Sequence, residues 1–265
     1  MSTIREKLTN MFSKVMAGTV TREEGTMLIN HLAKEDLAET VRELSYLIET
    51  PPPGVFPKTI LHTIALARNK AFHNILVASL DHKNEDVSIL AAEELARLKT
   101  SDARDVLVEH LTSDVYHVRK ASAAALAQFP DGLAILKKHI LTHSEPFFRL
   151  TSAQALIKAG KKGIETLLSV LSSGNEAAVV SIAEALIAAG KELGNAEIPK
   201  IFDALMMAGD RKDTQSILGL LKVAGSLKGK ARGFEGYVMA FEDYPFESVR
   251  KEARHALKQI RAALG

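Results

Sequence analysis

The chain has 265 residues, of which 46% are hydrophobic, 25% charged and 5% aromatic, with 34 Lys and Arg against 32 Asp and Glu. This length exceeds the usual size of one hydrophobic core, and the net charge is too small to indicate nucleic-acid binding by itself. The absence of cysteine excludes disulfides, thiolate metal sites and a cysteine nucleophile. No apolar run has signal-peptide or transmembrane length, so we predict a cytoplasmic protein that does not enter a membrane.

The first 54 residues predict helices without an obvious repeat. Thr21 and Glu24 form a capping-box pattern that begins a helix through Leu32. A second predicted helix, 37–48, ends before the prolines at 51–53, which cannot continue it. We therefore predict that residues 1–54 form an N-terminal helical cap and residues 55–265 form a repeat array. A separate partner-binding module is the alternative for the first segment.

The rest of the chain contains copies of one apolar and alanine-rich pattern. The clear copies are VSILAAEEL, VRKASAAAL, FRLTSAQAL, AVVSIAEAL and VRKEARHAL, at residues 87–95, 118–126, 148–156, 178–186 and 249–257. The closing leucines of the first four, Leu95, Leu126, Leu156 and Leu186, lie 31, 30 and 30 residues apart. Weaker copies occupy 56–64 and 213–221. A fixed period of this length is typical of repeat architectures.

Each clear copy except the last is followed by a second apolar helix, predicted at 105–111, 133–141, 164–171 and 198–207. The joints carry turn residues, as at 130–132, 159–163 and 189–195, where glycine suits a helix C-terminus. On a helical wheel, one face of the copy at 118–126 carries Val118, Ser122, Ala123, Ala125 and Leu126. This face predicts close packing between neighbouring helices. The sequence therefore predicts an all-α fold, a right-handed α-solenoid (superhelix) of stacked antiparallel helix pairs.

The pattern acid-x-x-x-V-R-x-A-x-A-x-A-L resembles HEAT-like repeats, especially the short repeats of phycobilisome-lyase-type proteins. The residues that carry it are Asp114 with 118–119, Glu145 with 148–149 and Glu247 with 249–250. The resemblance implies a buried structural ladder that links adjacent repeats, with Asp114, Arg119, Arg149 and Arg250 as its members. Ser88 and Val179 stand in place of the arginine in two copies.

The sequence supports no catalytic, cofactor-binding or metal-binding residue. His139 and His143 have metal-ligand spacing but no third ligand, and we predict that they lie at a solvated helix end. Residues 225–231 lack the hydroxyl and the preceding strand of a phosphate loop, so we predict a flexible connection over 226–236. The His–Glu dipeptides that HEAT-like di-iron hydroxylases use as ligands do not occur. We therefore predict a protein without enzymatic activity.

The side of each alanine-rich copy that lies opposite its packing face predicts where a partner binds. In HEAT-like arrays one helix of each pair, generally the second, lines the concave side, and we assign the alanine-rich copies to that side. The candidates are Glu93, Arg97, Lys120, Gln128, Gln154, Lys158, Glu184, Lys251 and His255. This mixture of charge and amide groups resembles a surface for a protein or peptide rather than a phosphate track. The leading hypothesis is a non-enzymatic scaffold or adaptor for protein–protein interaction.

Two other functions stay open at this point. Residues 211–265 contain eleven Lys and Arg against six Asp and Glu, which suits nucleic-acid binding at a basic C-terminal end. A bilin-lyase-like accessory function is implied only by the repeat resemblance. The sequence leaves the partner and the oligomeric state undetermined.

Overall fold

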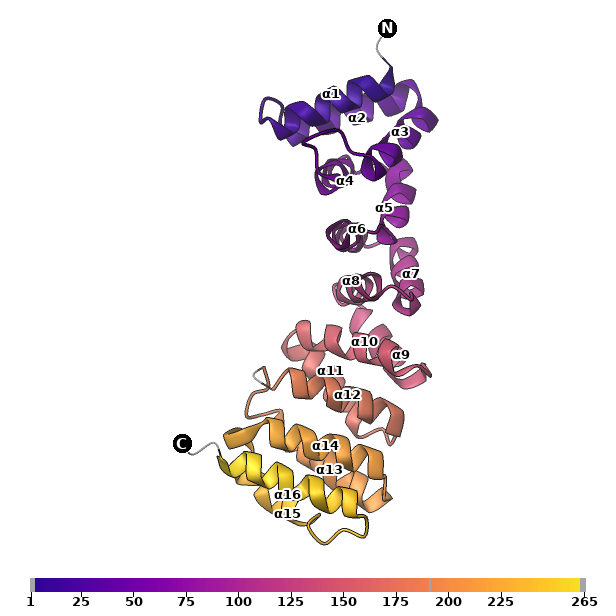
Figure 1. Cartoon of the computed structure of the whole chain (residues 1–265). Coiled ribbons are helices and arrows are strands. Elements are labelled where there is room, and N and C mark those ends of the chain that lie inside the picture. The colour runs from indigo at the N-terminus through magenta and orange to yellow at the C-terminus, as the bar shows by residue number, and fades with distance from the viewer. Residues whose placement is uncertain (1–2, 191, 263–265) are drawn as a thin grey trace. The chain divides into compact units, whose positions relative to one another are not determined.

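The computed structural model describes residues 3–190 and 192–262 (Figure 1). These residues form sixteen α-helices and three short 3-10 helices, and no strand occurs among them. The chain divides into two compact units, unit 1 over Met1–Phe129 and unit 2 over Pro130–Gly265. The predicted all-α fold of stacked helix pairs is confirmed.

Unit 1 is a stack of helices in two layers. Its helices are α1 (Ile4–Met16), α2 (Arg22–Glu35), α3 (Leu37–Glu49), α4 (Pro57–Leu66), η1 (Lys70–Phe72), α5 (His73–Leu80), α6 (Glu85–Leu98), α7 (Ser101–Glu109), η2 (His110–Thr112) and α8 (Tyr116–Leu126). Figure 1 shows α4, α6 and α8 end-on in one column, with α5 and α7 in a second column beside it. The helices α2, α4, α6 and α8 pack in succession and form what we call the even layer of unit 1.

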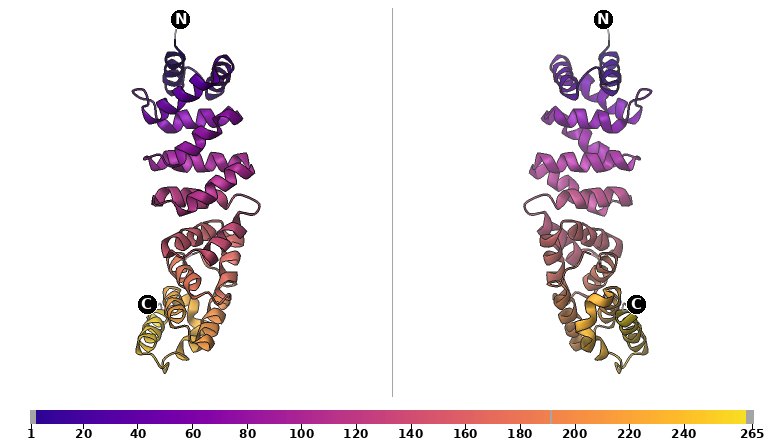
Figure 2. Two further views of the ribbon diagram at one scale, coloured as in Figure 1. Left: turned by 90° about the vertical axis from the view of Figure 1, so that its right-hand side faces the viewer. Right: turned by 90° about the vertical axis from the view of Figure 1, so that its left-hand side faces the viewer.

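Unit 2 repeats this arrangement. Its helices are α9 (Gly132–Thr142), α10 (Pro146–Lys158), α11 (Lys161–Leu171), α12 (Glu176–Ala188), α13 (Ile198–Arg211), α14 (Thr214–Ser226), η3 (Lys228–Phe234), α15 (Glu235–Met239) and α16 (Glu247–Ala262). The even layer of unit 2 consists of α10, α12, α14 and α16, which pack on one another more closely than α9, α11, α13 and α15 do. The two side views show the helices of each unit following one another in chain order (Figure 2).

The alanine-rich copies form the even layers because their small residues face inward. In α8, the exposed fraction is 0% for Val118, Ser122, Ala123 and Leu126 and 1% for Ala125. The helical-wheel prediction for this face is therefore confirmed. Small side chains let the helix axes approach closely, while valine and leucine supply the apolar area that stabilises the stack.

The helices begin and end where local chemistry favours it. At the start of α2, Thr21 accepts a hydrogen bond from the main-chain N–H of Glu24, and Glu24 accepts one from the N–H of Thr21. At the α10–α11 joint, Gly160 has φ +73°, and a Cβ on Gly163 would lie 1.9 Å from the carbonyl oxygen of Leu156. The predicted capping box is confirmed, and the second glycine at this joint is required by close packing rather than by the turn.

The segment after α14 differs from the prediction. The flexible connection expected over 226–236 is wrong, because this stretch forms η3 and the beginning of α15. The helices α1 and α5 also have no counterpart in the sequence prediction. The boundary between units 1 and 2 follows Phe129. The predicted division into a cap over 1–54 and a repeat array over 55–265 is a different one, drawn from the repeat pattern, and it stays a prediction.

Candidate functional site

Three buried or half-buried arginines bind the turn that precedes their own helix. Arg119 Nη1 donates to the main-chain carbonyls of Ser113 and Asp114, at 2.7 and 3.0 Å. Arg250 Nη1 donates in the same way to Tyr244 and Pro245, at 2.7 and 2.8 Å. A charged donor thus satisfies carbonyls of the turn before α8 and of the turn before α16, which fixes each of these turns against the even layer.

Arg149 extends this pattern to the next repeat. Its Nη1 donates to the carbonyls of His143 and Ser144, at 2.8 and 2.5 Å, and its Nε donates to Ser181 Oγ on α12, at 3.0 Å. Ser88, which replaces the arginine in α6, donates from its hydroxyl to the carbonyl of Leu80, at 2.5 Å. The arginine position therefore serves one role across several copies, and serine performs it over a shorter reach.

The predicted acid of the ladder lies differently. Asp114 is exposed, and the contact with Arg119 uses its main-chain carbonyl rather than its carboxylate. Among the described residues, no ion pair joins the Asp114 carboxylate to a basic side chain. The ladder assigned to Asp114, Arg119, Arg149 and Arg250 stays a prediction, and these contacts give it a geometry that stability measurements can test.

Eight of the nine candidate partner-binding residues lie on even-layer helices, and Gln128 directly follows one. On unit 1 they are Glu93 and Arg97 of α6, Lys120 of α8 and Gln128 just after α8, and on unit 2 they are Gln154 and Lys158 of α10, Glu184 of α12, and Lys251 and His255 of α16. Lys120 and Gln154 are half-buried, and the other seven are exposed. The structure therefore places each of them where a partner could reach it.

On unit 1 the two basic candidates, Arg97 and Lys120, are paired with neighbouring carboxylates. Arg97 forms an ion pair with Glu94, a buried carboxylate that also lies 3.4 Å from His62 Nδ1. Lys120 reaches from α8 to Glu85 of α6, with 3.3 Å between Nζ and Oε1. The Arg97–Glu94 pair lies within α6, whereas the Lys120–Glu85 pair joins α8 to α6, and both reduce the charge that unit 1 presents outward.

On unit 2 two of the five candidates contact a neighbouring side chain. Lys251 pairs with Glu247 one turn earlier, at 2.7 Å, and His255 lies 3.0 Å from Gln259 Nε2. Within residues 3–190 and 192–262, Lys158 and Glu184 form no ion pair. Exposed pairs of this kind contribute little to stability, so the lysines stay available to a partner.

The predicted solvated position of the histidine pair is wrong for His139. Its Nδ1 lies 2.9 Å from Ser152 Oγ on α10, and its Nε2 is buried without a hydrogen-bond partner among the described residues. Its ring centroid lies 4.9 Å from that of His143. Burial, and then the charge of His143, lower the pKa of His139 from 6.5 to about 4. His139 is therefore neutral near pH 7 and forms part of the α9–α10 packing.

The glycine-rich segment after α14 has structural contacts in place of phosphate-binding geometry. Lys230 Nζ donates to the carbonyls of Gly190 and Leu193 beyond α12, at 3.2 and 3.0 Å. A Cβ on Gly225 would lie 3.2 Å from Cα of Ala256, so this glycine permits close contact between α14 and α16. A cation near carbonyls that follow a helix C-terminus is electrostatically favourable.

The basic residues of 211–265 lie mainly on exposed surface. Lys222, Lys228, Lys251, Arg254 and Lys258 are all exposed. Arg254 and Lys258 form no ion pair with any residue that the structure describes. The excess of cations predicted for this segment is thus presented to solvent.

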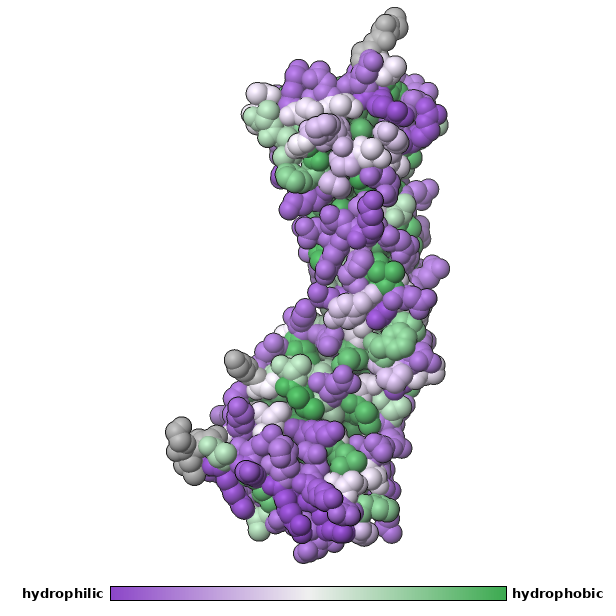
Figure 3. All heavy atoms as spheres, in the orientation of Figure 1, coloured by the Kyte–Doolittle hydropathy of each residue, from purple (hydrophilic) through white to green (hydrophobic). Residues whose placement is uncertain are grey.

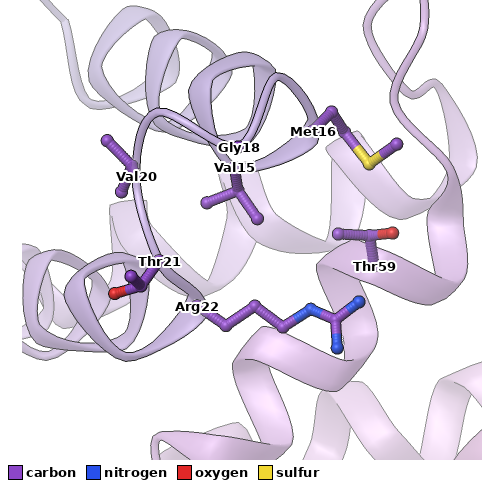
Figure 4. Close-up of a pocket in the computed structure, with 7 residues that line it drawn as sticks. All are labelled: Val15, Met16, Gly18, Val20, Thr21, Arg22 and Thr59. Carbon is purple, nitrogen blue, oxygen red and sulfur yellow. The ribbon is translucent and has the colours of Figure 1, made fainter.

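A pocket that sequence reasoning did not find lies in unit 1. It has a volume of about 410 Å³ and is lined by Val15, Met16, Gly18, Val20, Thr21, Arg22 and Thr59. Figure 4 shows the Arg22 side chain extending from the start of α2 toward α4, below Thr59. No sequence motif marks this pocket, because the α1–α2 turn and α4 form it together.

No group of three or more His, Asp or Glu side chains within residues 3–190 and 192–262 is arranged to hold a metal ion. Within the same ranges, no helix combines the length and the apolar composition that crossing a bilayer requires.

The comparison with protein families identifies the repeat. The family model for HEAT repeats matches residues 41–127 and 69–157. Residues 41–157 consist of HEAT-like repeats. No curated protein matches the sequence. The finer resemblance to phycobilisome-lyase-type repeats stays a prediction.

Solved structures of repeat proteins match the chain at low identity. Human deoxyhypusine hydroxylase in complex with glycerol is 15% identical, with 98% of this chain and 97% of that chain covered and a TM-score of 0.39. A designed armadillo repeat protein is 17% identical over 96% of this chain and 99% of its own, with a TM-score of 0.31. Kap121p bound to Ste12p is 14% identical over 96% of this chain and 33% of its own, with a TM-score of 0.42.

Proposed function

We propose that the chain is a non-enzymatic scaffold or adaptor that binds another protein through the exposed face of its even-layer helices. The observation that supports this proposal most strongly is the separation of roles within each even-layer helix. In α12, Ala183, Ala185 and Leu186 are buried in the stack, whereas Val180 and Glu184 are exposed. Every repeat therefore adds a short stripe of accessible side chains to a rigid layer.

The closer packing of the even layer supports its assignment as the binding side. A stack of helix pairs bends toward the layer in which the helices lie closer together, and in unit 2 that layer contains α10, α12, α14 and α16. An inner surface surrounds a bound segment on more sides than an outer surface does. Apolar and charged groups that alternate on it suit a protein partner better than a uniform phosphate backbone.

A comparative pull-down tests this proposal. The variant Glu93→Arg/Gln154→Arg/Glu184→Arg raises the net charge of the even layers by five, and we expect it to lose the partners that the unmodified chain captures. The matched control, Glu109→Arg/Ala134→Arg/Glu165→Arg, adds the same charge to exposed positions of α7, α9 and α11 and should retain them. Equal capture by both variants would contradict the assignment to the even layers.

A second candidate function is nucleic-acid binding at the basic segment 211–265, favoured by the exposed cations of α14 and α16. Binding to phosphates would weaken steeply with salt, since each contact releases condensed counterions. A salt titration with duplex and single-stranded oligonucleotides measures that slope. Absence of binding at low salt would remove this candidate.

A further inference from the structure

The exposed face of unit 2 changes character from one even-layer helix to the next. On α12, Val180 and Ile187 have exposed fractions of 37% and 38%, and on the neighbouring α10 Leu150 is half-buried. On α14 and α16, the corresponding surface carries Lys222 and Lys258. Figure 3 shows apolar side chains gathered over α10–α12 and a hydrophilic area over α14–α16.

The contacts between these helices place the apolar and cationic parts side by side. A Cβ on Gly219 of α14 would lie 3.0 Å from Cβ of Ala183 on α12, and Gly225 of α14 approaches Ala256 of α16 in the same way. Since α14 packs closely against both neighbours, its lysine lies between the α12 apolar residues and the α16 cations. Helix axes about 8–10 Å apart make the whole surface roughly 20–30 Å wide.

The charges of this surface are available to a partner. Among the described residues, Lys222, Arg254 and Lys258 form no ion pair, whereas Lys251 pairs with Glu247. The α12 stripe contains one exposed carboxylate, Glu184, between its two apolar residues. A partner that is acidic along its whole length would be repelled by that carboxylate, so the complementary partner is apolar at α12 and acidic at α14 and α16.

We propose that unit 2 binds an amphipathic segment of a partner protein, with large apolar side chains seated on α10–α12 and carboxylates reaching the lysines of α14 and α16. This proposal rests on the proposed function and specifies its partner. A helical segment of about 14–20 residues spans the surface at 1.5 Å per residue. Phosphate backbones fit less well, because α12 presents two exposed apolar side chains and the carboxylate of Glu184.

A peptide selection with the whole chain tests the proposal without a known partner. The probe is a display library of random peptides of about 20 residues. We expect the selected peptides to combine an excess of Asp and Glu with large apolar residues. Their affinity should fall about tenfold for Lys222→Glu/Lys258→Glu and for Val180→Gln/Ile187→Gln. Salt should weaken the contacts of the peptide carboxylates and leave the apolar contacts unchanged.

The control variant Lys138→Glu/Lys162→Glu reverses two exposed lysines of α9 and α11 and should leave the affinity unchanged. Selected peptides without an acidic excess, or with equal affinity for the α14 and α16 variant, would overturn the proposal. The proposal would also be overturned if no peptide bound and if, instead, a duplex oligonucleotide or a vesicle with anionic lipid bound through Lys222 and Lys258. The pull-down reports separately on the proposed function, since partner capture can depend on the even layers even if no acidic peptide is selected.

Discussion

Replacing Arg149 with alanine measures how strongly the predicted ladder stabilises unit 2. Arg149 has an exposed fraction of 5% and donates to two main-chain carbonyls and to Ser181 Oγ. Hydrogen bonds from a charged donor contribute about 1.5–3 kcal/mol each. The substitution also removes the cost of desolvating the guanidinium, which offsets part of this sum. We therefore expect the free energy of unfolding to fall by about 2–4 kcal/mol.

Three further substitutions show how much of the loss in unfolding free energy comes from the carbonyl contacts and how much from Ser181. Arg250→Ala removes two carbonyl contacts from a half-buried side chain and should cost about 1–2 kcal/mol. Ser181→Ala removes the acceptor for Arg149 Nε and also the hydroxyl's own bond to the carbonyl of Ala177. The double variant with Arg149→Ala isolates the Arg149–Ser181 bond, which we expect to contribute about 1 kcal/mol. Lys158→Ala changes an exposed residue of the same helix and should stay within about 0.5 kcal/mol of the unmodified chain.

The assay is urea unfolding followed by far-ultraviolet circular dichroism. Because the chain forms two compact units, the curves are fitted with two transitions, and the loss for Arg149→Ala should appear in one of them. If Arg149→Ala were no more destabilising than Lys158→Ala, the carbonyl contacts would contribute nothing measurable and the ladder prediction would be refuted.

Three other predictions concern buried polar groups and close packing, and each is read out by the same unfolding assay. Glu43→Gln removes a buried carboxylate whose pKa is lowered by its ion pair with Arg5, so it should cost about 1–2 kcal/mol at pH 7. This cost should shrink as the pH falls below about 4.5 through the lowered pKa, and a difference independent of pH would argue against the ion pair. Because folding lowers the pKa of His139 to about 4, stability should decrease by about 2–3 kcal/mol between pH 6.5 and 4, and His139→Gln should abolish that part of the decrease. Gly163→Ala forces a Cβ against a carbonyl of α10 and should cost about 2–4 kcal/mol, whereas Gly236→Ala, with open space around it, should be nearly neutral.

The fold was predictable because the determining signals recur along the chain. Each copy repeats its closing leucine and its small inward residues, so an error in one copy is corrected by the next. The capping box at Thr21 and Glu24 acts over three residues and is complete in local sequence. The alanine-rich helices and their packing face follow from such short-range patterns, and both agree with the structure.

The parts that sequence analysis missed depend on contacts between distant residues. The stretch over 226–236 contains three glycines, so its local propensity favours a loop, yet Lys230 and Glu235 tie it to Gly190 and Arg261. His139 is turned inward by Ser152 of the next helix, which its own surroundings in the sequence do not indicate. The Lys120–Glu85 pair could have been inferred, because the two residues are about one repeat apart.

The same scaffold can present different surfaces because packing and recognition use different positions of each helix. Gly219 sets the distance between α12 and α14, so a larger residue there would displace a whole helix and every side chain on it. Lys222 is one turn away on the exposed face, where charge reversal leaves that distance unchanged. Binding and stability are therefore separable in unit 2. In unit 1, where Lys120 and Arg97 also join neighbouring groups, substitutions that alter recognition should disturb the links within and between helices as well.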